Sequence, residues 1–142
     1  MRSKAPLAMM EQMIMLLVFA LAAALCLQAF VKSDALSRAS EDRDRAMTLC
    51  QNAAEAVRRC QGNMEQAAAL LDGARYDGAG LMADYDQDWE PAGETMRYTL
   101  GAARLDSGVN GLGKAQVWVR DEAEEQEIFR LEVAWQEVNA HG

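Results

Sequence analysis

The chain has 142 residues, of which 51% are hydrophobic, and a formal net charge of −8 at pH 7. This length allows one modest domain, and the excess of acidic residues repels phosphate backbones and anionic lipid head groups, so we expect no nucleic-acid partner. The only histidine, His141, cannot build a catalytic triad or a zinc site by itself, and we expect no enzyme activity and no bound cofactor.

The first predicted element is a transmembrane helix over residues 7–31. No charged residue interrupts the stretch from Met13 to Val31, which as a helix would be about 28 Å long, close to the thickness of a hydrocarbon core. Arg2 and Lys4 precede it in a basic leader, residues 1–6. Because positive charge is retained on the cytoplasmic side, we expect a single-pass protein of the cell membrane with a cytoplasmic N-terminus and an extracytoplasmic C-terminal part.

A cleaved secretory signal peptide is the alternative for the same stretch. The basic leader suits it, and the small residues 22–24 offer a site for signal peptidase. The apolar run continues, however, through Leu25, Phe30 and Val31, and cleavage would leave an apolar new N-terminus. The pattern therefore favours the membrane helix.

The helical pattern continues from residue 32 to residue 61 without Pro or Gly. Acidic residues stand four positions before basic ones, first at Asp34 and Arg38, which is the favourable order on a helix surface. From Ala46 onward, small and apolar residues recur at spacings of three and four, which predicts one buried face. Gly62 then predicts the end of the helix.

Residues 62–142 are predicted to form a small globular domain. Asn63 followed by Gln66 predicts the start of a short helix over residues 64–72. Turn residues follow, after which apolar residues alternate with a period of two in four stretches. These stretches contain Leu81, Ala83 and Tyr85; Met96, Tyr98 and Leu100; Ala115, Val117 and Val119; and Phe129, Leu131, Val133 and Trp135. We therefore expect an α+β fold in which the end of the long helix covers the apolar face of a four-stranded antiparallel sheet.

A carboxylate, Glu11, stands near the start of the membrane-length segment, where an isolated charge is costly. Counted from Leu7, it is the fifth residue of the stretch LAMMEQMI, residues 7–14. With the basic leader, the amphipathic continuation and the small sheet, this stretch resembles the type IV pilin and pseudopilin family. The resemblance implies that prepilin peptidase cuts between Pro6 and Leu7, and that Glu11 neutralises the N-terminal amine of a neighbouring subunit in a filament.

The residue before the implied cut departs from the family's pattern. That peptidase normally requires Gly, sometimes Ala, at this place, and the chain has Pro6. Either processing tolerates Pro6 or the leader is retained. In the second case the free amine belongs to Met1, and Glu11 is a carboxylate at the cytoplasmic interface.

Three aspartates, Asp84, Asp86 and Asp88, alternate along the chain as at the start of an EF-hand calcium loop. The match then fails, because Trp89 stands where that loop needs Gly and Thr95 stands where it needs Glu. Since some pseudopilins bind calcium, the aspartates are a candidate metal site of another kind. The simpler interpretation is a solvated acidic strand end.

Trp118 and Ile128 are predicted to point away from the apolar face of the sheet. A five-residue turn between their strands would place them opposite each other, which makes them a candidate interface patch. Isolated apolar residues are also ordinary on protein surfaces.

The sequence thus predicts a non-catalytic, pilin-like structural subunit, either a pseudopilin or a minor pilin, of a type IV pilus or type II secretion filament. Its expected partners are the membrane, prepilin peptidase and other pilin-like subunits, which it would meet through the N-terminal helix. The alternative is a membrane-anchored or secreted extracytoplasmic binding module that does not polymerise.

Overall fold

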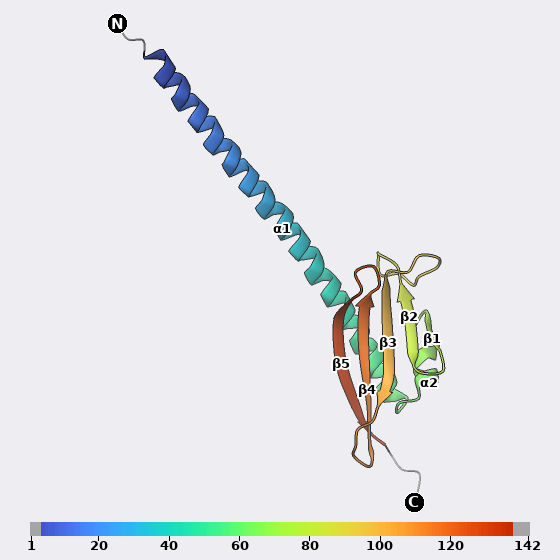
Figure 1. Cartoon of the computed structure of the whole chain (residues 1–142). Coiled ribbons are helices and arrows are strands. Elements are labelled where there is room, and N and C mark those ends of the chain that lie inside the picture. Colours follow the sequence, from blue (N-terminus) through green and yellow to red (C-terminus); the bar gives the residue numbers. More distant parts are fainter. Residues whose placement is uncertain (1–3, 138–142) are drawn as a thin grey trace, which may run out of the picture. The chain divides into compact units, whose positions relative to one another are not determined.

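The computed structural model describes residues 4–137. Its elements follow in the order α1 (Ala5–Arg59), α2 (Met64–Ala69), β1 (Ala74–Tyr76), β2 (Leu81–Tyr85), β3 (Tyr98–Leu105), β4 (Leu112–Asp121) and β5 (Gln126–Gln136) (Figure 1). The chain divides into two compact units, the first reaching Ser40 and the second starting at Glu41, so α1 contributes to both.

The long helix expected from the sequence is present as α1, which has 55 residues. Pro6 is its second residue, where a missing N–H costs nothing because the first turn has no intrahelical acceptor for it. At the other end Gly62 adopts a φ of +79°, and its N–H donates to the Val57 carbonyl oxygen at 2.9 Å. This left-handed glycine closes the helix as the sequence predicts.

The short helix α2 begins where it was expected and ends earlier. The side chain of Asn63 accepts a hydrogen bond from the backbone N–H of Gln66 at 3.1 Å, which caps the helix. After Ala69 the hydrogen bonds tighten, since Leu70 donates to the Ala67 carbonyl oxygen, three residues back. The helix therefore ends at Ala69 rather than at residue 72.

The sheet has five antiparallel strands rather than the four expected, in the order β1-β2-β3-β4-β5. The additional strand is β1, in which Ala74 pairs with Ala83 and Tyr76 with Leu81. No alternation of apolar residues indicated β1, because the strand is only three residues long and two of these residues are exposed. Strands this short form through pairing with a longer neighbour rather than through their own alternation of side chains.

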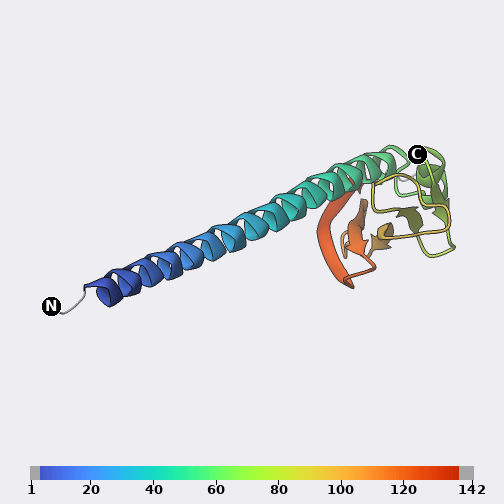
Figure 2. The ribbon, with the colours of Figure 1, turned by 90° about the horizontal axis from the view of Figure 1, so that it is seen from above.

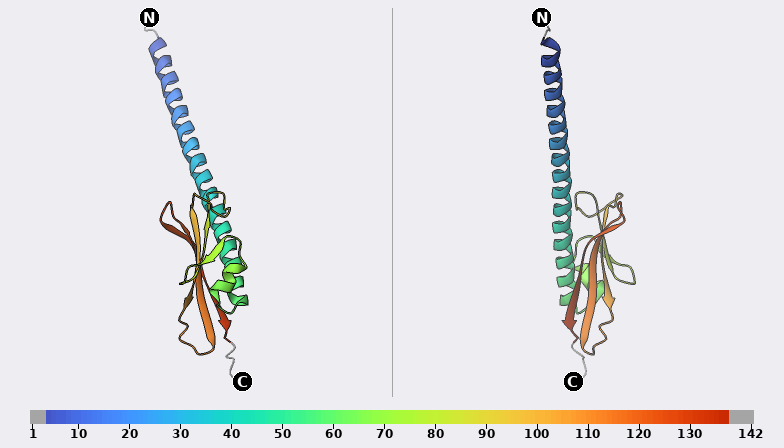
Figure 3. Two further views of the ribbon diagram at one scale, coloured as in Figure 1. Left: turned by 90° about the vertical axis from the view of Figure 1, so that its right-hand side faces the viewer. Right: turned by 60° about the vertical axis from the view of Figure 1, so that its left-hand side comes forward.

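In the unit that starts at Glu41, the end of α1 and α2 cover one face of the sheet (Figures 2 and 3). The face of α1 that meets the sheet is made of small side chains, and Ala46, Cys50 and Ala53 have no exposed surface. Larger residues fill the core from the sheet side, among them Tyr98 and Leu100. The expected packing of helix on sheet is therefore present.

Trp135 closes the core at the end of β5, where only 6% of it is exposed. A Cβ atom at Gly62 or at Gly113 would collide with its indole ring, so both backbones approach the ring closely. The guanidinium of Arg104 lies over the same ring, 5.5 Å from its centroid. These contacts bind the turn after α1 to the last strand.

Candidate functional sites

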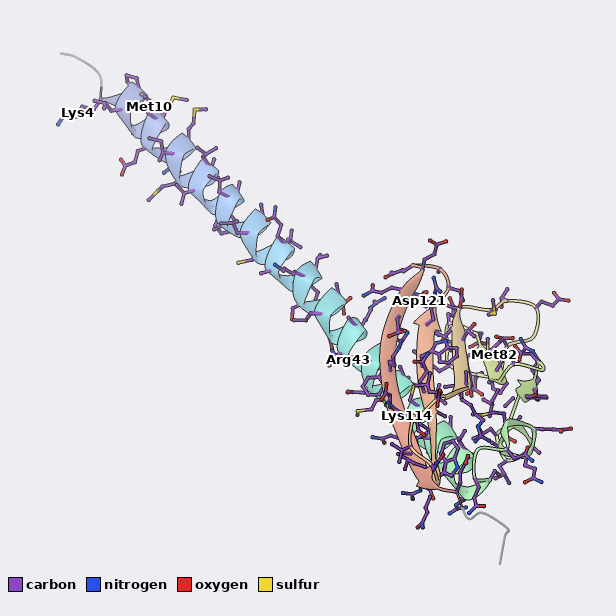
Figure 4. All side chains as sticks on the ribbon, turned by 60° about the horizontal axis from the view of Figure 1, so that its bottom comes forward. Lys4, Met10, Arg43, Met82, Lys114 and Asp121 are labelled. Atoms are coloured by element: carbon purple, nitrogen blue, oxygen red, sulfur yellow. The ribbon has the colours of Figure 1, made fainter. Side chains whose placement is uncertain are left out.

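By its length and composition, the first part of α1 is long and apolar enough to cross a membrane. Its large apolar side chains point outward in all directions, with exposed fractions from 57% at Ile14 to 74% at Phe19. Figure 4 shows side chains around the whole circumference of this part of the helix, where Lys4 and Met10 are labelled. Such a surface requires an apolar environment, which lipid or neighbouring helices can provide.

Glu11 lies on this helix among apolar residues. Its neighbours one turn away are Leu7 and Ala8 on one side and Ile14 and Met15 on the other, none of which can pair with a carboxylate. Within residues 4–137, no ion pair includes Glu11. The carboxylate therefore finds no counter-charge in the described part of its own chain.

The implied processing point lies inside the first turn of α1. Pro6 and Leu7 are both helical, and the N–H of Ala8 donates to the Lys4 carbonyl oxygen at 3.2 Å. A peptidase that cuts between Pro6 and Leu7 would need this turn to open, which is easily done at the frayed end of a helix.

Of the three aspartates of the candidate metal site, Asp84 and Asp86 use their carboxylates in separate contacts. The carboxylate of Asp84 accepts hydrogen bonds from the guanidinium of Arg75 at 2.5 Å and from the hydroxyl of Thr99 at 3.3 Å. Asp86 accepts the backbone N–H of Asp88 at 2.8 Å, which stabilises the turn after β2. Across residues 4–137, no group of three or more His, Cys, Asp or Glu side chains is placed to hold a metal.

The expected pairing of Trp118 with Ile128 is wrong. Trp118 lies opposite Arg130 on β5 and Gly101 on β3, and its ring covers that glycine on the face away from α1. The register of β4 and β5 shifts after Val119, which leaves Ile128 as an extra residue without a partner. This bulge turns Ile128 toward the core, against which it packs, so the two residues do not form one patch.

A cluster that the sequence did not predict joins the helix to the sheet around Trp89. The indole N–H of Trp89 donates to the carboxylate of Asp42 on α1 at 3.2 Å. The Trp89 ring stacks on Tyr98, with 3.8 Å between ring centroids. Burial, followed by the nearby charge of Asp42, raises the pKa of Tyr98 to about 12. The three residues come from distant parts of the chain, so only the tertiary structure could reveal the cluster.

A second buried group fixes the turn between β4 and β5. Asp121 is only 5% exposed, and one of its carboxylate oxygens accepts a hydrogen bond from the guanidinium of Arg97 at 3.3 Å. Its other oxygen accepts the backbone N–H groups of Ala123 and Glu124 at 2.9 and 3.2 Å. Asp121, labelled in Figure 4, is thus held by bonds that stabilise the turn.

Beside Trp89 the surface forms an open groove of about 340 Å³. Its lining combines one side of α1 with the indole ring, through Glu41, Asp44, Arg45, Thr48, Leu49 and Trp89. Within the groove, the Thr48 hydroxyl donates to the Asp44 carbonyl oxygen at 3.0 Å, and His141 lies outside the described residues.

No family model, curated protein or solved structure matches this chain. A functional assignment therefore rests on the apolar segment 7–31 of α1, its single charge at Glu11, and the sheet domain packed on the other end of the helix.

Proposed function

We propose that this chain is a pilin-like, membrane-anchored structural subunit, a pseudopilin or minor pilin of a secretion or pilus filament, without catalytic activity. The observation that carries the proposal is α1, in which an apolar segment with a carboxylate at the fifth place after Leu7 is followed by a face that packs on a small antiparallel sheet. One helix thus supplies both the anchor and part of the globular core.

In this proposal Glu11 is an assembly residue. A carboxylate in an apolar environment costs several kcal/mol unless a counter-charge accompanies it, and the described part of its own chain offers none. The N-terminal amine of Leu7 in a neighbouring, processed subunit would supply that charge. The pair would form only on assembly, so it would favour the filament over the isolated subunit.

The rest of the subunit would serve packing and display. The apolar surface of residues 7–31 would contact neighbouring helices as well as lipid. The acidic domain would then lie outside the membrane, on the surface of the filament. Prepilin peptidase and other pilin-like subunits are the partners that this arrangement requires.

The decisive variant is Glu11→Gln in the full-length chain. Insertion into the membrane should be unchanged, because it depends on the apolar residues from Met13 to Val31. Crosslinking to partner pilins through residues 7–31 should fall, because a buried ammonium left without its counter-charge costs roughly 3–5 kcal/mol. Membrane fractionation and crosslinking of the same samples measure both effects.

A matched control moves the charge by one residue. The double variant Glu11→Gln with Gln12→Glu keeps the net charge but turns the carboxylate by about 100° around the helix axis. Assembly through a specific amine should not recover in this variant. Equal crosslinking in the wild type, Glu11→Gln and the double variant would mean that Glu11 is an interfacial carboxylate and would contradict the mechanism.

Pro6 favours one alternative, a plain membrane anchor that keeps its leader. Mass spectrometry of the mature N-terminus separates the possibilities. The pilin proposal expects a chain that starts at Leu7, a plain anchor would start at Met1, and a secreted binding module would start near Leu25.

A further inference from the structure

The last strand, β5, forms a long and open edge of the sheet. It has eleven residues, contains neither Pro nor Gly, and within residues 4–137 pairs only with β4. The opposite edge is formed by β1, which has three residues. Proteins usually shorten or interrupt exposed edges because the free backbone groups can pair with another strand. β1 is shortened in this way, whereas β5 has only a bulge near its start.

After the bulge at Ile128, the free backbone groups of β5 belong to its even-numbered residues. The N–H of Glu137 donates to the Gly111 carbonyl oxygen, which marks Gly111 and Glu137 as a hydrogen-bonded pair. In an antiparallel ladder such pairs recur at every second residue, so Leu131 and Val133 also bond to β4. The N–H and C=O groups of the residues that alternate with these, Arg130, Glu132 and Ala134, therefore point outward at the free edge of the sheet.

The core side of this edge is only partly covered. Phe129, Leu131 and Val133 pack against the core but remain half-buried, whereas Val117 and Val119 on the adjacent strand have no exposed surface. A further strand beside β5 would cover this apolar row and would satisfy the free backbone groups at the same time.

We propose that β5 pairs with β5 of a second copy of this chain, antiparallel and about a two-fold axis at Leu131. Leu131 is the midpoint of Gln126–Gln136, and this register pairs Phe129 to Val133 of the two copies continuously, up to the bulge at Ile128 in each copy. It also places Arg130 of each copy opposite Glu132 of the other, and these are residues whose backbone groups face the free edge. The neighbouring registers would oppose Arg130 to Arg130 or Glu132 to Glu132, which is unfavourable.

The charges needed for this contact are accessible in the single chain. Arg130 pairs with Glu127 and Glu132 pairs with Lys114, but the side chains of Arg130 and Glu132 are 50% and 54% exposed. Exposed pairs of this kind are weak and can be shared with a partner. The two-fold axis places the α1 segments of the two domains on the same face of the joined sheet and in opposite directions. The contact is therefore separate from the parallel packing of neighbouring helices that the proposed function describes.

A cysteine placed on the axis tests the register in the full-length chain, with Cys26 and Cys60 replaced by serine. In the proposed pair Leu131 faces itself at a position without hydrogen bonds, where Cα atoms are about 4.5 Å apart, within reach of a disulfide. Leu131→Cys should therefore give a disulfide-linked dimer under mild oxidation. The control is Arg120→Cys, on β4 and away from the edge, which should stay monomeric. Equal dimer in both variants, or none in Leu131→Cys, would overturn the proposal.

Charge reversal tests the partner and the register together. In the Leu131→Cys background, Arg130→Glu alone and Glu132→Arg alone should each lower the dimer yield at least roughly tenfold, because two like-charge pairs then face each other. The double reversal should restore the yield. Arg120→Glu makes the same charge change as Arg130→Glu outside the contact and should have no effect.

Thermal unfolding of each variant separates loss of the contact from loss of the fold. A double reversal that folds normally but fails to restore the dimer would contradict the register. Since this contact uses the sheet edge, it should persist in Glu11→Gln, which affects only assembly through α1.

Discussion

At the residue scale, the contact between helix and sheet includes two titratable side chains whose pKa values burial raises. Cys50 faces the sheet without any exposed surface. Burial, and to a smaller extent the charge of Glu127, raises the pKa of its thiol to about 12, and Tyr98 shifts in the same direction. In both groups burial favours the neutral form, so ionisation of the thiol or the phenol costs more in the folded than in the unfolded state.

The raised pKa values predict a loss of stability in alkali. A group whose pKa is higher in the folded state contributes its stabilisation below its unfolded pKa, which is 9.0 for Cys50 and 10.0 for Tyr98. The free energy of unfolding should therefore fall as the pH rises from 9 toward 12. Urea unfolding at a series of pH values measures the slope. Cys50→Ala should flatten it, whereas Cys60→Ala should not, and an unchanged slope in Cys50→Ala would contradict the assignment.

At the scale of elements, the spacing between α1 and the sheet is set by alanine. Ala46, Ala53 and Ala56 lie between the helix backbone and the larger side chains of the sheet. A larger side chain at any of these positions would have to push the two layers apart, because protein interiors are close-packed.

Ala53→Leu should lower the free energy of unfolding by about 1–3 kcal/mol, because the added atoms have no space in the core. Gln51→Leu is the matched control, since Gln51 is exposed on the same turn of the helix. Thermal or chemical denaturation of both variants gives the comparison. If the two variants unfold alike, the helix does not pack on the sheet through this face.

At the scale of the whole molecule, the unit that starts at Glu41 contains both layers of the core. We expect a fragment of residues 33–142 to be soluble and to unfold cooperatively, because the helix end already covers the sheet. A fragment of residues 62–142 lacks this cover and should bind ANS and aggregate. Gel filtration and dye binding compare the two. A monomeric, cooperatively folded 62–142 fragment would show that the sheet does not need the helix.

The sequence by itself determined the elements whose signals are local. The apolar run, the alanine spacing and Gly62 predicted the long helix, and Asn63 with Gln66 predicted the start of α2. The alternation of apolar residues located the four longer strands and the face that meets the helix, except that Met96, expected in the second of these strands, precedes β3 and is 52% exposed. Each of these signals depends only on residues a few positions apart, so no knowledge of the fold was needed.

The tertiary structure decided what depends on residues far apart in the chain. β1 exists because Leu81 and Ala83 on β2 offer it a partner, and its own three residues carry no pattern. The bulge after Val119, which turns Ile128 into the core, is a property of two paired strands and not of either one. In the same way Asp42 and Trp89 meet only when the helix lies on the sheet, because a hydrogen bond between residues 47 positions apart leaves no trace in local spacing.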